Sequence, residues 1–281
     1  MAAFVRAVYA PFFFFFFVSA AIYLVGQGAG LYWLAPLLVS AIIISRIVEY
    51  LLPYEQVWNE PNGDRLRDFI HAVVNETSII SLLLFMPLAA KLVPWPSIWP
   101  TNIPLWIQVS LAIILLDIGI TLVHFLSHRW NLLWRFHAVH HSVTRMYGFN
   151  GLLKHPVHQL IEILGGTLPW LLLGIPTEIA AIGAFCVSTQ LLLQHSNVDM
   201  KIGWLRYLWA VAPVHRHHHI ASSSKGDVNF GLFLTIWDVL LGTANFSSSR
   251  NVRSGKIGIE NSADYPSDYW GQLLEPLKEK S

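Results

Sequence analysis

Six apolar stretches dominate the chain and constrain its fold more than any other feature. They run over Val8–Val25, Leu31–Leu52, Phe69–Val93, Ile103–Phe125, Leu160–Ile175 and Thr177–Leu193. A helix needs about 20 residues to cross a bilayer, so the first four are long enough. The last two are shorter and are joined by the tight turn 174–176, which fits either a tilted helical hairpin or a re-entrant pair. The pattern predicts an all-α, polytopic integral membrane bundle.

Composition agrees with a membrane protein and excludes several other classes. Of the 281 residues, 54% are hydrophobic and only 12% are charged, about half the charged fraction of a soluble domain. The net charge of +1 provides no large basic field, so nucleic acid is not expected as a partner. The one cysteine, Cys186, lies in an apolar run, which excludes an intrachain disulfide and any cysteine-based zinc or iron–sulfur site.

The distribution of basic residues predicts the topology. The loops 26–30, 94–104 and 174–176 contain no Lys or Arg, whereas the opposite ends carry many, among them Arg46, Arg65 and Arg145. The positive-inside rule therefore places the N-terminus, the C-terminus and all histidine clusters in the cytoplasm. The first stretch, with Arg6 and a small-residue site at 18–20, could also be a cleaved signal peptide. Its apolar run continues to Val25, which favours an uncleaved anchor.

The chain divides into three regions without an obvious linker. Residues 1–109 hold the N-terminal transmembrane helices, residues 110–245 carry the histidine clusters, and residues 246–281 form a polar tail that is expected to be a short cytoplasmic extension. The tail begins with Ser247, Ser248, Ser249 and Arg250, followed by Arg253 and Lys256.

Eight of the thirteen histidines fall into three clusters with related spacing. They are His124 and His128, then His137, His140 and His141, and finally His215, His218 and His219. On a helix, positions i, i+3 and i+4 share one face, so the rings of each cluster would converge. His217, two positions from His215, would point away.

This arrangement predicts a site for two metal ions, forming a histidine-cluster cap on the cytosolic side of the bundle. Neutral imidazole binds iron, copper, nickel or zinc, and a single tetrahedral zinc would use only three or four of these residues. An isolated histidine such as His71 is expected instead to be a polar surface residue or a helix cap.

Several further residues are candidates for the same site. His195, at the end of the sixth stretch, is predicted to be a ninth ligand rather than a capping residue. His155 and His158 belong either to the metal site or to the membrane interface, and Pro156 argues against a helix that runs through His155. Asp117 lies seven residues before His124, where it either hydrogen-bonds a ligand histidine or makes a structural contact to a neighbouring helix.

Residues 110–245 resemble the fatty acid hydroxylase and sterol desaturase superfamily. The resemblance lies in HFLSH and WRFHAVHHS within 117–142, in HRHHH at 215–219, in Asn229-Phe230-Gly231, in Trp237-Asp238 and in Gly242-Thr243. It implies a cytosolic di-iron site on a membrane anchor, held by the eight clustered histidines and His195. Asn229 resembles a residue that completes such sites directly or through water, and Asp238 is a further candidate there. Phe125 and His217 depart from the family pattern, in which Arg and an aromatic residue are frequent.

The resemblance implies an O2-dependent oxidoreductase that hydroxylates or desaturates a lipid. A sterol, a carotenoid, a fatty acid and a sphingoid base all remain compatible substrates. Because the chain contains no flavin, haem or iron–sulfur motif, two electrons per turnover would come from a separate donor, such as a cytochrome b5-like protein or a ferredoxin with its reductase.

Two alternatives from other classes are weaker. A histidine-rich metal transport or storage protein needs polar groups through the membrane midplane, where only Asp117 qualifies clearly. A bis-histidine haem protein needs axial ligands that face each other across helices, which the dense HxxHH blocks outside the apolar stretches do not suit.

Overall fold

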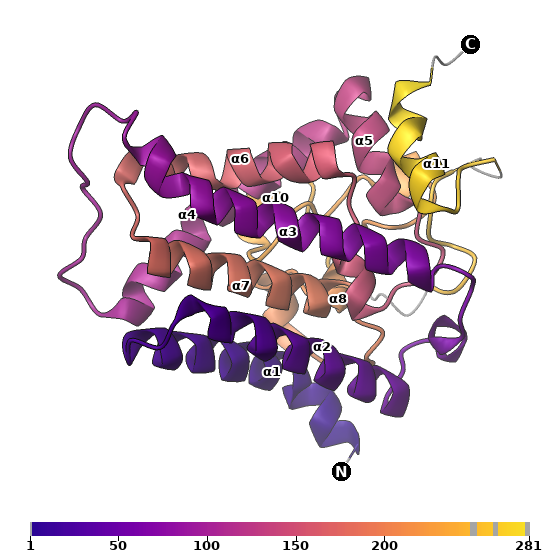
Figure 1. The fold of residues 1–281 in the computed structure, drawn as a ribbon. Helices are drawn as coiled ribbons and strands as arrows, with labels where there is room; N and C mark the ends of the chain where they lie inside the picture. Colours follow the sequence, from indigo (N-terminus) through magenta and orange to yellow (C-terminus); the bar gives the residue numbers. More distant parts are fainter. Residues whose placement is uncertain (1, 248–251, 261–263, 279–281) are drawn as a thin grey trace.

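The computed structural model describes residues 2–247, 252–260 and 264–278 (Figure 1). Ser248, Ser249 and Arg250 of the predicted tail lie outside the described residues.

Each of the six apolar stretches forms a helix, and the described part of the chain has no strand beyond three isolated bridges, which confirms the all-helical prediction. The six are α1 (Ala2–Gly26), α2 (Leu34–Leu51, preceded by the 3-10 turn η1, Leu31–Trp33), α3 (Arg65–Ala90), α4 (Leu105–Ser127), α6 (Pro156–Leu173) and α7 (Thr177–Gln194). In the described residues, five helices are long and apolar enough to cross a membrane: α1, η1 with α2, α3, α4 and α7. The sixth, α6, carries His158, Gln159 and Glu162 in its first half.

Helix α7 runs through the middle of the bundle. It contacts α1, α2, α3 and α4, and 83% of its most apolar window is buried inside the molecule. Its apolar residues therefore serve a protein core rather than a lipid-facing surface. Helix α6 packs against α4 along a small-residue seam. A Cβ at Gly119 of α4 would lie 2.2 Å from the Gly165 carbonyl oxygen of α6, so only glycine allows this approach.

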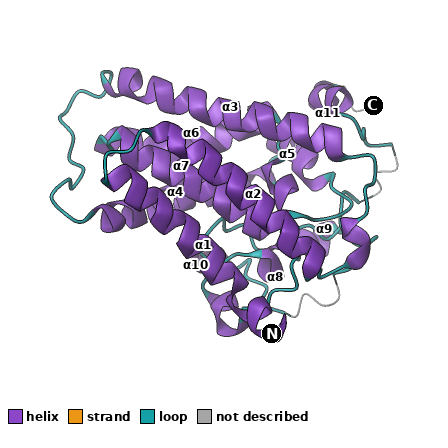
Figure 2. Cartoon of the chain, turned by 60° about the horizontal axis from the view of Figure 1, so that its bottom comes forward, coloured by secondary structure: helices purple, strands orange, loops and turns teal. Residues whose placement is uncertain are grey.

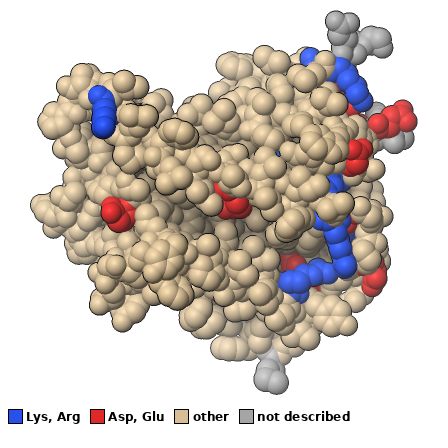
Figure 3. All heavy atoms as spheres, in the orientation of Figure 1, with Lys and Arg blue, Asp and Glu red and all other residues tan. Residues whose placement is uncertain are grey.

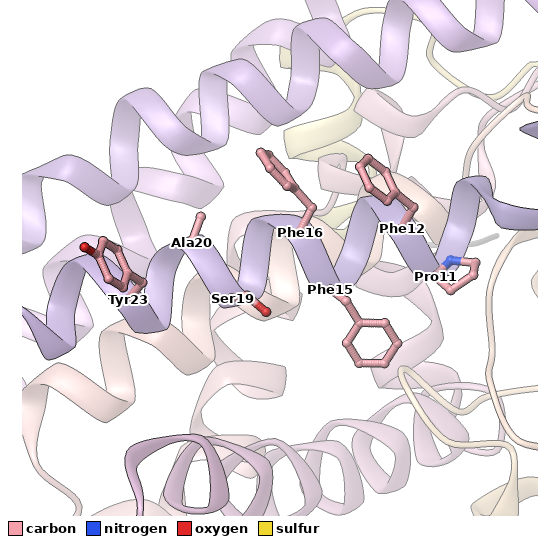
Figure 4. A pocket seen from close by; sticks show the side chains of 7 residues that line it. All are labelled: Pro11, Phe12, Phe15, Phe16, Ser19, Ala20 and Tyr23. Atoms are coloured by element: carbon pink, nitrogen blue, oxygen red, sulfur yellow. The ribbon is translucent and has the colours of Figure 1, made fainter.

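The outer faces of the bundle are apolar. On α1 the side chains of Phe12, Phe15, Phe16 and Tyr23 project outward around a shallow groove, and each is more than half exposed (Figure 4). Over the face seen in Figure 3, charged side chains gather mainly at the right-hand end, next to a wide belt with few charges. Exposed aromatic residues and a belt with few charges are what a lipid-facing surface requires, so the protein is an integral membrane protein.

Short helices and loops follow and connect the long helices, and most of them lie at the end of the bundle where the charged side chains gather (Figures 1 and 2). They are η2 (Gln56–Asn59), α5 (Asn131–His141), η3 (Gly148–Leu152), η4 (Gly203–Tyr207), α8 (Ala212–His215), α9 (Ser223–Gly226), α10 (Ile236–Leu241), α11 (Tyr269–Leu274) and η6 (Glu275–Leu277).

The C-terminal segment packs against this end instead of extending freely. In both ribbon views α11 lies beside α3, with which it is in contact, and Tyr269 and Gln272 of α11 are buried. The amide oxygen of Gln272 is 3.0 Å from His71 Nε2, and the Lys154 carbonyl oxygen is 3.0 Å from His71 Nδ1. The expectation that His71 is a surface residue or a helix cap is therefore wrong, because the tail and the 150s loop cover it completely.

Candidate metal centre

The structure brings all nine predicted ligand histidines together in two adjacent groups. The five-histidine group contains His124, His128, His137, His141 and His218, and the four-histidine group contains His140, His195, His215 and His219. Within each group, one ring nitrogen from every member lies within 4.8 Å of those of the others. The groups share a wall, because the His141 and His219 rings are 4.7 Å apart and the His215 and His218 rings are 5.0 Å apart. The arrangement can hold two metal ions close to each other.

Each group collects histidines from several elements, and α5 contributes to both. In the five-histidine group, His124 lies in the last turn of α4, His128 is its C-cap residue, and His137 and His141 lie one turn apart on α5. The four-histidine group takes His140 from α5, His195 from the C-cap of α7, and His215 from the end of α8.

The HRHHH block is helical only at its start. Helix α8 has four residues and ends at His215, and the chain continues as turns, so the prediction of a helix through His219 is wrong. The turns, closed by a bond from His218 N to the His215 carbonyl oxygen (2.9 Å), still bring His218 and His219 inward. The His217 ring lies outside both groups, with Nε2 3.2 Å from the Ser247 carbonyl oxygen.

Backbone carbonyls determine which ring nitrogen of His124 and His218 carries the proton. His124 Nδ1 is 2.8 Å from the Phe230 carbonyl oxygen, and His218 Nδ1 is 2.9 Å from that of Val228. Since a carbonyl only accepts, each Nδ1 donates and each Nε2 presents a lone pair. The two Nε2 atoms face each other at 2.8 Å, and two lone pairs cannot hydrogen-bond to one another. A cation between them removes this repulsion, so the residues fit a metal ion.

In the four-histidine group, too, hydrogen bonds at Nδ1 leave Nε2 free to bind a metal. His140 Nδ1 donates to the Leu153 carbonyl oxygen (2.9 Å), and His195 Nδ1 donates to Asn150 Oδ1 (3.1 Å). That oxygen also accepts the Tyr147 amide, so Asn150 cannot be the donor to His195. His195 Nε2 is left buried without a hydrogen-bond partner among the described residues, as expected of a nitrogen that binds metal.

The rings are held in the neutral form that metals require. Burial is the largest cause that lowers the pKa of the imidazoles well below 6.5, and adjacent imidazoles lower it further, because neighbouring rings resist being protonated together. This holds for His137, His140, His141, His195, His215, His218 and His219. Neutral imidazole is the form that donates a lone pair to a metal.

Two buried carboxylates shape the loop behind the centre. Asp117 accepts hydrogen bonds from Phe233 N (2.8 Å), Leu234 N (2.9 Å) and Trp237 Nε1 (2.7 Å). Asp238 accepts from Phe230 N (2.7 Å), Gly231 N (2.9 Å) and the Thr243 hydroxyl (2.7 Å). Both hold the loop whose Phe230 carbonyl receives His124. Of the two alternatives for Asp117, the described contacts match the structural one, because its partners are two loop amides, the Trp237 indole of α10 and the Thr121 hydroxyl, and not a histidine ring.

Three other candidates lie outside the two groups. Asn229 has a left-handed backbone (φ 56°), and its side-chain amide donates to Val214 O of α8 (2.9 Å) and to Asn245 O (2.9 Å). His155 is the N-cap residue of α6, with Nε2 3.1 Å from the Leu273 carbonyl oxygen. His158 lies beside the centre: its ring is 4.4 Å from that of His137, and its Nε2 is 2.9 Å from the Ser127 hydroxyl.

Sequence reasoning missed four residues at the centre. Asp227 lies 3.4 Å from His128 Nδ1 and pairs with Arg129, and Asn150 supports His195. Lys154 and Glu162 form a buried ion pair. Both line a cavity of about 10 Å³, room for about one water, together with residues of both histidine groups. Glu162 carried a usable signal, a carboxylate within an apolar stretch four residues after His158, whereas Asn150 carried none.

Known proteins share sequence similarity with this chain over the region that forms the metal centre. The fatty acid hydroxylase family model matches residues 109–243. The chain is 32% identical to the ornithine lipid hydroxylase OlsE of Rhizobium tropici over 263 residues, which cover 89% of this chain and 77% of that protein. The chain belongs to the fatty acid hydroxylase superfamily. It is also 31% identical to the alkylglycerol monooxygenase of Danio rerio over 153 residues, which cover 53% of this chain and 31% of that enzyme. No solved structure matches.

Family membership and geometry together define the kind of enzyme. The chain is a membrane lipid hydroxylase of the fatty acid hydroxylase family, with buried histidine groups able to bind metal. This conclusion replaces the transport and haem-protein alternatives.

Proposed function

We propose that this hydroxylase inserts oxygen into a membrane lipid of the ornithine lipid type, using two iron ions, O2 and electrons from a separate donor. The substrate class rests on the similarity to OlsE, which extends over 89% of this chain. The metal requirement rests on the two adjacent histidine groups, which provide nine nitrogen ligands and no competing sulfur ligand.

Iron is the metal that suits both the ligands and the reaction. Imidazole binds zinc, copper, iron and nickel, and among these iron is widely used for O2 chemistry. When bound, two irons supply the redox chemistry that inserts one oxygen atom into a C–H bond. The balance is one lipid C–H, one O2, two electrons and two protons, giving one hydroxylated lipid and one water.

The residues of this chain orient and shield that chemistry. Hydrogen bonds at Nδ1 of His124, His140 and His218 direct each Nε2 toward a metal position. Burial of the rings excludes bulk water, which protects a reactive oxidant from side reactions. Ile120 of α4, Leu191 of α7 and Leu232 supply apolar parts of the wall of the small cavity, which supports approach of the lipid from the bundle.

The expected topology places the histidine end in the cytoplasm, where an electron donor can reach it. The single native cysteine, Cys186, is fully buried, so a thiol reagent should label only the cysteines that are introduced. Lys225→Cys should be labelled from the cytoplasmic side, and Asn102→Cys, in the basic-free loop, from the opposite side. Labelling of Lys225→Cys from the opposite side would contradict this orientation.

The substrate is tested by expressing the chain in a bacterium that makes ornithine lipids and has no hydroxylase for them. Mass spectrometry should find ornithine lipid with one added oxygen, derived from isotopically labelled O2. His218→Ala should give none at equal membrane abundance, whereas His217→Ala should give product. A different lipid that gains the oxygen would refute the substrate, and iron-loaded protein that oxidises no lipid would refute the whole proposal.

A further inference from the structure

A second polar site lies away from the histidines, between α2 and α3 at the histidine end of the molecule. It is a pocket of about 360 Å³ that contains no member of either histidine group. The C-terminal half of α2 and the start of α3 form two of its walls, and the segment from Arg145 to Phe149 forms the third.

Three guanidinium groups line this pocket, and they differ in how they are held. Arg145 is buried and makes a two-pronged ion pair with Asp64 (2.6 and 2.7 Å). Arg46 is held by two long contacts: its Nη2 donates to the Asn59 carbonyl oxygen (3.4 Å), and its Nη1 lies 3.7 Å from Glu49 Oε2 without a hydrogen-bond acceptor among the described residues. Arg65 is exposed and forms no ion pair within the described part of the chain.

The local charge balance favours one bound anion. Arg46, Arg65 and Arg145 face two carboxylates, Glu49 and the Asp64 that pairs with Arg145. The buried Glu49 accepts hydrogen bonds from the amides of Gly148 (2.6 Å) and Asn197 (3.0 Å) through Oε1, and its Oε2 lies 3.7 Å from Arg46 Nη1. The pocket therefore has a surplus of one positive charge. Arg46 and Arg65 each have N–H groups that are not paired with a carboxylate at hydrogen-bond distance.

The remaining wall is apolar and continues into the lipid-facing surface. Ile42 lines the pocket from α2 and Phe69 from α3, and Phe69 is 56% exposed. Both helices are long and apolar enough to cross the membrane. A ligand that fills the pocket would thus have an anionic group at the membrane interface and an apolar chain along the helices.

We propose that this pocket binds one anionic phospholipid, with its phosphodiester on Arg46 and Arg65 and an acyl chain along Ile42 and Phe69. Guanidinium groups match phosphate oxygens in geometry and charge. Basic pockets between membrane helices at the interface commonly hold lipid headgroups. The site is separate from the proposed metal centre, because none of the residues that line it belongs to either histidine group.

The test uses the full-length protein in nanodiscs or detergent and measures retained lipid by native mass spectrometry. Phosphatidylglycerol should bind at one molecule per chain in preference to phosphatidylcholine. Each guanidinium near a membrane surface contributes about 1 kcal/mol to anionic lipid binding. Arg65→Gln should therefore weaken binding about fivefold, and Arg46→Gln with Arg65→Gln by about thirtyfold. Lys91→Gln, an exposed basic residue just beyond the opposite end of α3, is the matched control and should bind as the unmodified chain does.

Arg65 makes no described ion pair, so Arg65→Gln is not expected to disturb the fold, and helix content by circular dichroism checks this for both variants. Equal phosphatidylglycerol retention in the double variant and the unmodified chain would overturn the proposal, as would equal retention of phosphatidylcholine. If free glycerol phosphate or inorganic phosphate displaces the lipid completely at equal concentration, the site binds a soluble anion and the lipid assignment is wrong.

Discussion

The two histidine groups have the same chemistry but different construction. Four of the five members of the first group come from α4, its C-cap and α5, within 18 residues of chain, 124–141. The second group draws its four members from α5, the end of α7, α8 and the turn after it. Four members of the first group thus come from one short segment, with only His218 added from a distant turn, whereas the second group exists only when distant helices are docked.

The two groups also differ in how many ligands remain when one histidine is removed. Loss of one imidazole leaves four nitrogens in the first group and only three in the second. His195, the member from α7, depends on Asn150 of η3, which makes the second group sensitive to how η3 packs against α7. We therefore expect the four-histidine group to be the weaker metal site.

The largest effect is expected from His219→Ala compared with His128→Ala. His219→Ala should lose the second metal and lower activity by at least about a thousandfold, about 4 kcal/mol in the barrier. His128 belongs to the larger group and its side chain is 8% exposed, so His128→Ala should retain both metals and lose less activity. Metal content per chain and lipid product formation measure both, and the comparison fails if His128→Ala loses metal as completely as His219→Ala.

A smaller effect should follow from changes at Asn150, which supports His195 without being a ligand. Asn150→Ala removes the acceptor of the Nδ1 hydrogen bond and should weaken metal binding in the four-histidine group by about 10–100-fold. Asn150→Asp keeps an acceptor and should largely restore affinity, which a merely structural loss would not explain. Metal titration of both variants measures this, and equal affinities for Asn150→Ala and the unmodified chain would rule out the positioning role.

The metal-free protein should lose stability as the pH falls. The folded-state pKa values of the buried imidazoles lie well below 6.5, the value expected in the unfolded chain, so the unfolded state binds more protons near pH 6. Their contribution to stability is fully present above about pH 7 and is lost as the pH falls through 6.5 toward the lowered values. Thermal unfolding of the metal-free protein between about pH 7.5 and 5.5 measures this. His141→Gln and His219→Gln should each reduce the slope by about one proton, and an unfolding temperature independent of pH would contradict the neutral state of both groups.

The smallest effect is expected from His217→Ala. The ring contacts the Ser247 carbonyl oxygen and lies outside both groups. Its loss should cost less than about tenfold in activity, about 1.4 kcal/mol, and should leave two metals bound. If His217→Ala were as inactive as His218→Ala at equal abundance, the boundary between ligands and their neighbours would have to be redrawn.

Local patterns in the sequence predicted the parts of this molecule that local geometry determines. The apolar stretches predicted the six long helices, and the i, i+4 spacings predicted that His124 and His128, like His137 and His141, would converge. His195 could be proposed only from its place at the end of an apolar stretch.

Residues held by tertiary contacts were not predictable in the same way. The partners of His71 and His195 are Gln272 and Asn150, which lie 201 and 45 residues away in sequence. The turn after His215 has no helical repeat, so spacing could not predict its backbone. Asp117 was correctly singled out as a buried carboxylate, but its partners Phe233 and Trp237 become visible only when the segment that ends in α10 is folded against α4.

The central claim is that the two histidine groups hold one iron each, and metal analysis of the protein tests it most directly. Full-length protein purified without O2 and reconstituted with ferrous iron should contain two irons per chain. Zinc found after overexpression would not bear on the claim, because zinc outcompetes ferrous iron at nitrogen sites. His219→Ala should lower the content to one iron and His217→Ala should leave it at two. Less than one iron per chain in the reconstituted, folded protein would contradict the account.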